Sequence, residues 1–357
     1  MSTINKALKV KSKKAQVDCV DIFCGIGGLT HGLINGGIKV RAGYDLDLNC
    51  KFAFETNNKA KFIQKDVKEI KISDLRQFFG KDSVSMLAGC APCQPFSTYS
   101  RTGRSERNDN KWDLLLSFGA LVRKSKPHLV TMENVPELSR HKVFELFLKD
   151  LKGYHVDWKI IDCTEYGIPQ TRKRLVLIAS RIGAISLWKP KRKNIKTVRE
   201  AISHLPPIEA GESDATDNMH SSCALSELNL KRIKASSPGG SWRDWDPDIV
   251  AECHRKDSGS TYPSVYGRME WDAPSPTITT QCFGFGNGRF GHPDQDRAIS
   301  LREAAILQTF PEDYVFLKPE EKVVFNKIGR LIGNAVPVKL GELVAKSIKA
   351  HLTINSI

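Results

Sequence analysis

The 357-residue sequence contains no long hydrophobic segment. A membrane-spanning helix needs roughly 18 or more consecutive apolar residues, and no run in this chain reaches that length. Residues 1–16 also lack the apolar core of a signal peptide and carry five lysines instead. We therefore expect a cytoplasmic protein without a membrane partner, whose residues 1–16 form a flexible basic tail.

The nine cysteines form no disulfide framework or zinc-binding pattern. Their odd number and irregular spacing in a long chain favour reduced thiols. One Cys-x-x-Cys pair occurs, Cys90 and Cys93, and neither a second such pair nor a His-x-His cluster is present to complete a structural zinc site. We predict no metal cofactor.

Acidic residues are in the minority, with 40 Asp and Glu against 54 Lys and Arg, for a net charge of +14. The excess lies in the N-terminal tail, in residues 101–126 and around residues 170–174, whereas residues 183–297 are balanced. Locally concentrated positive charge indicates a polyanionic partner.

A glycine-rich turn follows the first predicted strand, residues 17–23, and leads into a predicted helix. Glycines such as Gly25 and Gly27 let backbone amides approach a ligand, and the helix N-terminus favours the polar end of that ligand. A second predicted strand, residues 40–44, ends in Asp45, where a carboxylate can accept both ribose hydroxyls of a nucleoside. This layout predicts an α/β fold, a doubly wound and mostly parallel sheet with an adenosine-containing ligand at its carboxyl edge.

Two cofactor classes fit this layout, a dinucleotide and S-adenosylmethionine. The dinucleotide fingerprint needs a third glycine, and the spacing after Gly25 does not supply it. Asp21, before the turn, would repel a pyrophosphate but could receive the α-ammonium of a methionine moiety. The residues favour S-adenosylmethionine.

A second pair of strand ends carries groups suited to catalysis. Cys93 lies between two prolines after the predicted strand 84–88 and before a basic loop, residues 98–111. Glu133 ends the predicted strand 127–132, so a thiol and a carboxyl group meet at one sheet edge as a nucleophile and acid pair. An ordinary buried cysteine and a redox pair of Cys90 with Cys93 remain alternatives on these residues alone.

Residues 183–297 are rich in Ser, Pro, Gly, Trp and Asp, and show little periodicity apart from a predicted helix near residues 225–234. We interpret this segment as a smaller loop-rich domain. Loops on a scaffold commonly carry recognition, so we expect this domain to contact the partner. It interrupts a catalytic and cofactor-binding domain made of residues 17–182 and 298–357. Ser300 and Glu303 form a capping box that predicts a helix start.

In their order along the chain these motifs resemble those of the DNA (cytosine-5) methyltransferases of bacterial restriction-modification systems. The matching motifs are DIFCGIGG at Asp21, the acids Asp45 and Asp66, APCQPFS around Cys93, ENV at Glu133, QTRKR at Gln170, REA at Arg302 and GNAVPV at Gly333. The resemblance implies the Rossmann-like fold of class I S-adenosylmethionine-dependent methyltransferases. It also implies that residues 183–297 are the target-recognition domain and that the last helix packs back beside the first strand.

The resemblance implies four catalytic residues. Cys93 would add to C6 of cytosine, Glu133 would hold N3 and the exocyclic amine, and Arg174 would contact O2 with support from Arg172. The target base must be flipped out of the duplex, and residues 98–111 would close over it as a lid. Alternation along the strand places Arg172 and Arg174 on the same side.

The implied cofactor site uses the other strand ends, with adenine against Phe23, ribose on Asp45, and the methionine end near Asn334 and the glycine turn. The full set of implied residues is Asp21, Phe23, Gly25, Gly27, Asp45, Leu46, Asp66 and Asn334. Leu46 stands where relatives often have an aromatic residue, so we expect different packing on the adenine. The product would be S-adenosyl-L-homocysteine.

Two further functions stay open, an RNA (tRNA) cytosine-5 methyltransferase and a catalytically silent DNA-binding protein of the same fold. The long segment 183–297 favours the DNA enzyme. We expect a monomer acting on double-stranded DNA, with any cognate restriction endonuclease acting separately. Reading guanine edges, contacting phosphates and simple solubility are the alternative roles for four arginines of this segment, Arg243, Arg255, Arg268 and Arg289.

Overall fold

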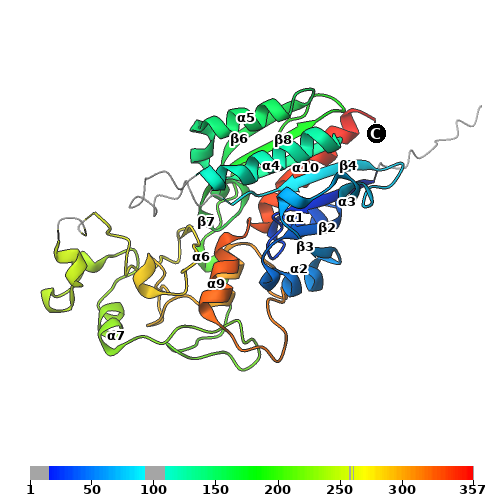
Figure 1. Cartoon of the computed structure of the whole chain (residues 1–357). Coiled ribbons are helices and arrows are strands. Elements are labelled where there is room, and N and C mark those ends of the chain that lie inside the picture. Colours follow the sequence, from blue (N-terminus) through cyan, green and yellow to red (C-terminus); the bar gives the residue numbers. More distant parts are fainter. Residues whose placement is uncertain (1–15, 93–108, 257–258, 260, 357) are drawn as a thin grey trace, which may run out of the picture.

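The computed structural model describes residues 16–92, 109–256, 259 and 261–356. Within these residues a seven-stranded sheet has the order β3-β2-β1-β4-β5-β8-β6 (Figure 1). Strands β1 to β5 are parallel, and β8 runs antiparallel to both β5 and β6. The strands are β1 (Val17–Ile22), β2 (Lys39–Asp45), β3 (Lys61–Gln64), β4 (Val84–Gly89), β5 (Leu129–Asn134), β6 (His155–Asp162) and β8 (Lys173–Ser180). The predicted doubly wound, mostly parallel sheet is confirmed.

Helices cover both faces of the sheet, which explains why its central strands β1, β4 and β5 are almost entirely buried. In β1, Cys19 joins the core on one face, whereas Val20 and Ile22 join the core on the other. The first face carries α1 (Gly28–Asn35), α2 (Lys51–Asn58) and α10 (Val338–Ile354), and the second carries α3 (Ile72–Arg76), α4 (Asp109–Ser125) and α5 (Lys142–Asp150).

The closing helix α10 returns to the start of the fold, where it packs against α1, the helix that follows the first strand. The two helices approach closely because glycines line their contact. A Cβ atom on Gly32 would lie 2.0 Å from the carbonyl oxygen of Val338, and one on Gly341 would lie 2.6 Å from that of Leu29. Motif order predicted this return, and the contact is with α1 rather than with the strand itself.

The chain reverses its direction across the sheet between β1 and β4. From β1 it proceeds through β2 to β3 on one side, and from β4 to β5 on the other. Ligands of open α/β sheets bind at the carboxyl ends of the strands beside such a switch point. The ends of β1 and β4 are paired there through Ile22 and Gly89.

Residues 183–297 extend away from the sheet, toward the left of Figure 1. The segment contains α6 (Val198–Ile202), α7 (Glu227–Lys234) and several single turns, and its short strand β9 (Ser275–Pro276) pairs with β7 (Gln170–Thr171). The chain then returns through α8 (Leu301–Leu307) and α9 (Phe325–Asn334). The predicted helix near residues 225–234 is α7, and the predicted capping box begins α8.

Two buried arginines hold the loop-rich segment together. Arg297 is 1% exposed and makes two hydrogen bonds of 2.8 Å to the carboxylate of Glu303. Arg268 is 4% exposed and donates to main-chain carbonyl groups from two stretches of the segment, residues 233–236 and 292–295, including those of Ile233 and His292. Both guanidinium groups therefore bind other parts of the protein. Among the described residues no helix has the length and apolarity to cross a membrane.

Candidate active site

The glycine-rich turn after β1 has a left-handed backbone at three positions, Phe23 (φ 63°), Gly25 (φ 51°) and Gly27 (φ 91°). This conformation is strained for a side chain such as that of Phe23, and strain of this kind gathers at functional sites. A Cβ atom on Gly25 would meet no atom within 4 Å, so that side of the turn is open. A Cβ on Gly27 would lie 2.5 Å from Asn58, so only glycine fits there.

Asp45, at the end of β2, is tied to the glycine turn. Its Oδ2 accepts a hydrogen bond from the Gly25 amide at 2.9 Å, and its Oδ1 accepts one from the Asp47 amide at 2.9 Å. Burial raises the pKa of this carboxyl group. Each oxygen retains a second lone pair, so the carboxylate can still accept hydroxyl groups. Leu46 follows it with 57% of its surface exposed.

Asp21 is 1% exposed, and only one of its oxygens is hydrogen-bonded. Oδ2 accepts from the Thr30 hydroxyl at 2.6 Å, whereas Oδ1 is buried without a hydrogen-bond partner among the described residues. Burial raises the pKa of Asp21 to about 7. A buried acceptor without a donor is unfavourable by about 1–3 kcal/mol, which a bound ammonium group would relieve.

The last two predicted cofactor residues lie around the same edge. Asp66 caps a short turn, where its Oδ1 accepts from the Lys68 amide at 2.9 Å. Asn334 is exposed at the end of α9. The chain just after it lies against the glycine turn, because a Cβ on Gly28 would be 2.2 Å from the Val336 carbonyl oxygen.

Glu133, near the end of β5, is 5% exposed and has two partners within the described part of the chain. Its Oε2 accepts a hydrogen bond from the Cys90 thiol at 2.8 Å. Its Oε1 lies 2.9 Å from Nε of Arg174, an ion pair without the angle of a hydrogen bond. Oε1 therefore has no hydrogen-bond donor among the described residues, and it can accept one from a ligand.

Arg172 is buried beside this pair. Its Nη1 donates to the Ile278 carbonyl at 3.2 Å, and its Nε is buried without a hydrogen-bond partner among the described residues. Burial and the charge of Arg174 lower the pKa of Arg172 to about 10, while the Glu133 carboxylate opposes that shift. The guanidinium therefore stays protonated at neutral pH. The charges of Arg172, Arg174 and Glu133 act on one another.

Cys93 and residues 94–108 lie outside the described residues, so the predicted nucleophile and most of the predicted lid are not placed. The chain just before them is anchored. Asn134 is buried at the end of β5 and its Nδ2 donates to the Ala91 carbonyl at 3.0 Å. The predicted lid, residues 98–111, also extends too far, because α4 already begins at Asp109.

Gln170 is a site residue whose role the motif pattern did not reveal. It is fully buried, and its Nε2 donates to the Leu307 carbonyl at 2.8 Å and to Oε1 of Gln308 at 2.7 Å. These bonds fix the stretch that carries Arg172 and Arg174 against the end of α8. The partners are 137 and 138 residues away, so no local signal could have identified them.

The four arginines considered as possible DNA contacts divide into two groups. Arg268 is wrong as a candidate, because its guanidinium is buried and bonded to main-chain carbonyl groups. Arg289 donates to the carbonyls of Gly240 and Arg268. Arg243 and Arg255 are exposed and line an open surface hollow of about 450 Å³.

Comparison with known proteins gives one consistent result. The family model described as C-5 cytosine-specific DNA methylase matches residues 17–350. The Type II methylase M.HgiDII of Herpetosiphon aurantiacus is 50% identical over 340 residues, which cover 93% of this chain and 95% of the relative. The Type II methyltransferase M.Sau96I of Staphylococcus aureus is 30% identical over 352 residues, covering 95% of this chain and 77% of the relative.

Solved structures share the fold. A crystal structure of a candidate DNA modification methyltransferase encoded within an E. coli prophage matches with a TM-score of 0.72 and 21% identity, covering 95% of this chain and all of the other. The Entamoeba histolytica methyltransferase EhMeth matches with a TM-score of 0.64 and 15% identity, covering 94% of this chain and 99% of the other.

Proposed function

Since the chain belongs to the C-5 cytosine-specific DNA methylase family and is a DNA (cytosine-5) methyltransferase of the Type II kind, we propose that Cys93, Glu133, Arg172 and Arg174 carry out its reaction. The observation that supports this assignment is the arrangement around Glu133. Its carboxylate is buried and paired with Arg174, yet Oε1 and the nearby Arg172 Nε keep hydrogen-bonding capacity for a ligand. The target is a cytosine flipped out of duplex DNA.

In the proposed reaction, the Cys93 thiolate forms a bond to C6 of the cytosine, and the electron pair of the C5–C6 double bond makes C5 nucleophilic. Glu133 holds N3 and the exocyclic amine, and Arg174 binds O2, so that both stabilise the charge that develops on the ring. S-adenosylmethionine would supply the methyl group that C5 takes up, and it would leave as S-adenosyl-L-homocysteine. A water then accepts the C5 proton, and the electron pair of that C–H bond restores the double bond as Cys93 leaves as a thiolate by β-elimination.

The residues of the glycine turn fit S-adenosylmethionine as the methyl donor. The unpaired buried Oδ1 of Asp21 suits an ammonium group, and the open side of Gly25 leaves room beside the turn. We assign the methionine end to Asp21, Gly25, Gly27 and Asn334. We assign the ribose to Asp45 and the adenine to Phe23, Leu46 and Asp66.

The partner in this proposal is double-stranded DNA, and residues 183–297 are its target-recognition domain. Arg243 and Arg255 are the exposed arginines that remain as contacts to bases or phosphates, since Arg268 is buried. We propose that the protein acts as a monomer near the nucleoid in the cytoplasm, and that any cognate restriction endonuclease acts separately.

Methyl transfer from tritium-labelled S-adenosylmethionine to duplex DNA and to tRNA tests the proposed substrate. We expect label in duplex DNA and none in tRNA. Label in tRNA alone would replace the DNA substrate by an RNA, and no label in either would indicate a silent DNA-binding protein. Bisulfite sequencing of DNA from cells that express the protein then identifies the methylated cytosine and its sequence context.

A further inference from the structure

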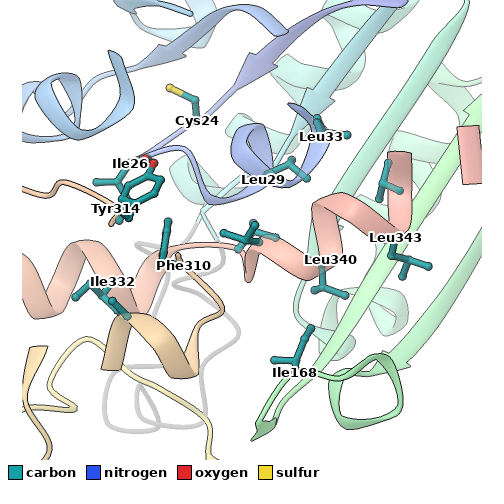
Figure 2. Packing of buried hydrophobic residues seen from close by; sticks show 14 of the residues in the cluster. Cys24, Ile26, Leu29, Leu33, Ile168, Phe310, Tyr314, Ile332, Leu340 and Leu343 are labelled. Atoms are coloured by element: carbon teal, nitrogen blue, oxygen red, sulfur yellow. Dashed lines mark hydrogen bonds between the residues drawn. The ribbon is translucent and has the colours of Figure 1, made fainter. Parts of the chain in front are cut away.

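The glycine-rich turn is held by a tyrosine that lies 288 residues further along the chain. Tyr314 is 1% exposed, and its hydroxyl donates a hydrogen bond of 2.5 Å to the carbonyl of Ile26. Ile26 lies between Gly25 and Gly27, so this bond fixes the peptide at the centre of the turn. Figure 2 shows the Tyr314 ring beside Ile26, with Phe310 below it.

The same hydroxyl is also an acceptor, so its hydrogen-bonding capacity is directed at the elements around the turn. It accepts from Nδ2 of Asn58 at 3.2 Å, and Oδ1 of Asn58 contacts Nδ1 of His31 at 3.1 Å. The His31 ring meets the Tyr314 ring edge-on, with 5.2 Å between centroids. The hydroxyl therefore joins the turn to α1 and to the end of α2.

Tyr314 is itself anchored from the loop-rich segment. Its carbonyl accepts from Nη1 of Arg302 at 3.1 Å. The Arg302 guanidinium makes two hydrogen bonds to the carboxylate of Asp217, at 2.5 Å and 3.0 Å. A continuous set of polar contacts thus connects the segment 183–297 with the glycine turn.

A turn with left-handed residues at Phe23, Gly25 and Gly27 needs surrounding contacts to keep it in one conformation. The bond to Ile26 is a buried contact of this kind, and it lies next to the Gly25 amide that binds Asp45. We propose that Tyr314 is a positioning residue for the methyl donor, whose hydroxyl holds the turn in the conformation that binds S-adenosylmethionine. This inference rests on the cofactor site proposed above.

The test compares Tyr314→Phe with Tyr154→Phe in the full chain. Tyr154 is a matched control because its partly buried hydroxyl also donates to a backbone carbonyl, that of Pro127 at 2.7 Å, and it is not part of the glycine turn. Calorimetry measures binding of S-adenosyl-L-homocysteine, and circular dichroism measures folding and Tm. If the turn adopts its binding conformation in only about a tenth of the molecules, the protein binds the ligand about tenfold more weakly than one whose turn is always in that conformation.

We expect Tyr314→Phe to weaken S-adenosyl-L-homocysteine binding about tenfold and to raise the KM for S-adenosylmethionine, with kcat at saturation changed by less than about twofold. Tyr154→Phe should bind S-adenosyl-L-homocysteine like the wild type, even if its Tm falls as much as that of Tyr314→Phe. Equal affinity of the wild type and Tyr314→Phe would overturn the positioning role. A wild type that binds no S-adenosyl-L-homocysteine would instead refute the cofactor site, and the positioning role with it.

Discussion

Buried charges are used differently at the sheet edge and in the loop-rich segment. At the edge, Asp21, Glu133 and Arg172 each keep a buried polar atom that lacks a hydrogen-bond partner among the described residues. In the loop-rich segment, the guanidinium groups of Arg268 and Arg297 donate hydrogen bonds to backbone carbonyls and carboxylates. Among the described residues of that segment the unpartnered atom is Nε2 of His254, whose ring is stacked on Trp242 with 4.4 Å between centroids.

The difference separates charges that serve a ligand from charges that serve the fold. Unsatisfied buried polar atoms are unfavourable and rare, so three of them at one sheet edge indicate a place where a ligand completes the bonding. Saturated arginines in a segment with little regular structure replace the hydrogen bonds that strands and helices would otherwise provide. Substitutions at the edge should therefore affect catalysis or binding, and substitutions in the segment should affect stability.

The largest expected effect distinguishes two buried glutamates. Glu133→Gln keeps the shape of the side chain but removes its charge and its ability to share a proton, so we expect kcat to fall about a thousandfold with the fold retained. Glu303→Gln should instead lower stability, since it removes the charge that pairs with Arg297. Methyl-transfer kinetics and urea unfolding of both variants check this contrast. If Glu133→Gln and Glu303→Gln lose similar activity per folded molecule, the proposed difference between the two glutamates would be wrong.

Arg297→Ala leaves the Glu303 carboxylate buried without its main partner. Breaking a buried ion pair in this way typically destabilises a protein by about 3–5 kcal/mol, and we expect a loss in that range. Arg172→Ala is the matched variant at the sheet edge, where we expect a smaller loss of stability and a larger loss of kcat. Denaturant unfolding measures the stability of both variants, and methyl-transfer kinetics measure their kcat. Equal destabilisation by the two variants would contradict the proposed division.

The pH dependence of cofactor binding tests Asp21. Its pKa of about 7 means that the carboxylate needed for an ammonium group forms only as the pH rises through neutrality. S-adenosyl-L-homocysteine should therefore bind the wild type about tenfold more tightly at about pH 8 than at about pH 6, and Asp21→Asn should lose this dependence. A pH dependence that persists in Asp21→Asn would assign it to another group.

The stability effect of Asp21 has the opposite sign. A carboxyl group whose pKa is raised in the folded state stabilises the fold fully only below its unfolded pKa of about 4, and this contribution is lost as the pH rises through about 7. We therefore expect Asp21→Asn to be more stable than the wild type at about pH 8 and to differ least at acidic pH. Thermal unfolding across this range measures the difference.

The smallest expected effect concerns Cys90. Its thiol donates to Glu133, and a hydrogen bond to a charged group is worth about 1.5 kcal/mol or slightly more, so Cys90→Ala should retain methyl transfer within about tenfold of the wild type. Cys90→Ser should lie closer to the wild type because it keeps a donor. If Cys90→Ala loses all activity and added reductant does not restore it, the alternative redox pair of Cys90 with Cys93 would be favoured.

The framework of the molecule could be predicted from sequence because its signals are local. The strand ends at Asp45 and Glu133 and the glycine turn follow short apolar runs, and the capping box at Ser300 lies within four residues. The contacts of Arg268, Gln170 and Tyr314 could not be predicted, because their partners are distant in the chain. A buried arginine that bonds to carbonyls has no local pattern that differs from one that binds DNA.

Covalent trapping on duplex DNA that contains 5-fluorocytosine, in the presence of S-adenosylmethionine, tests the central claim most directly. After methyl transfer, fluorine at C5 cannot leave as the proton does, so the adduct persists. The DNA must carry the recognition sequence found by bisulfite sequencing. We predict a denaturant-resistant complex with the wild type and with Cys90→Ser, and none with Cys93→Ser. A complex that still forms with Cys93→Ser, or that is absent from a wild type which methylates the unmodified sequence, would contradict the proposed attack by Cys93.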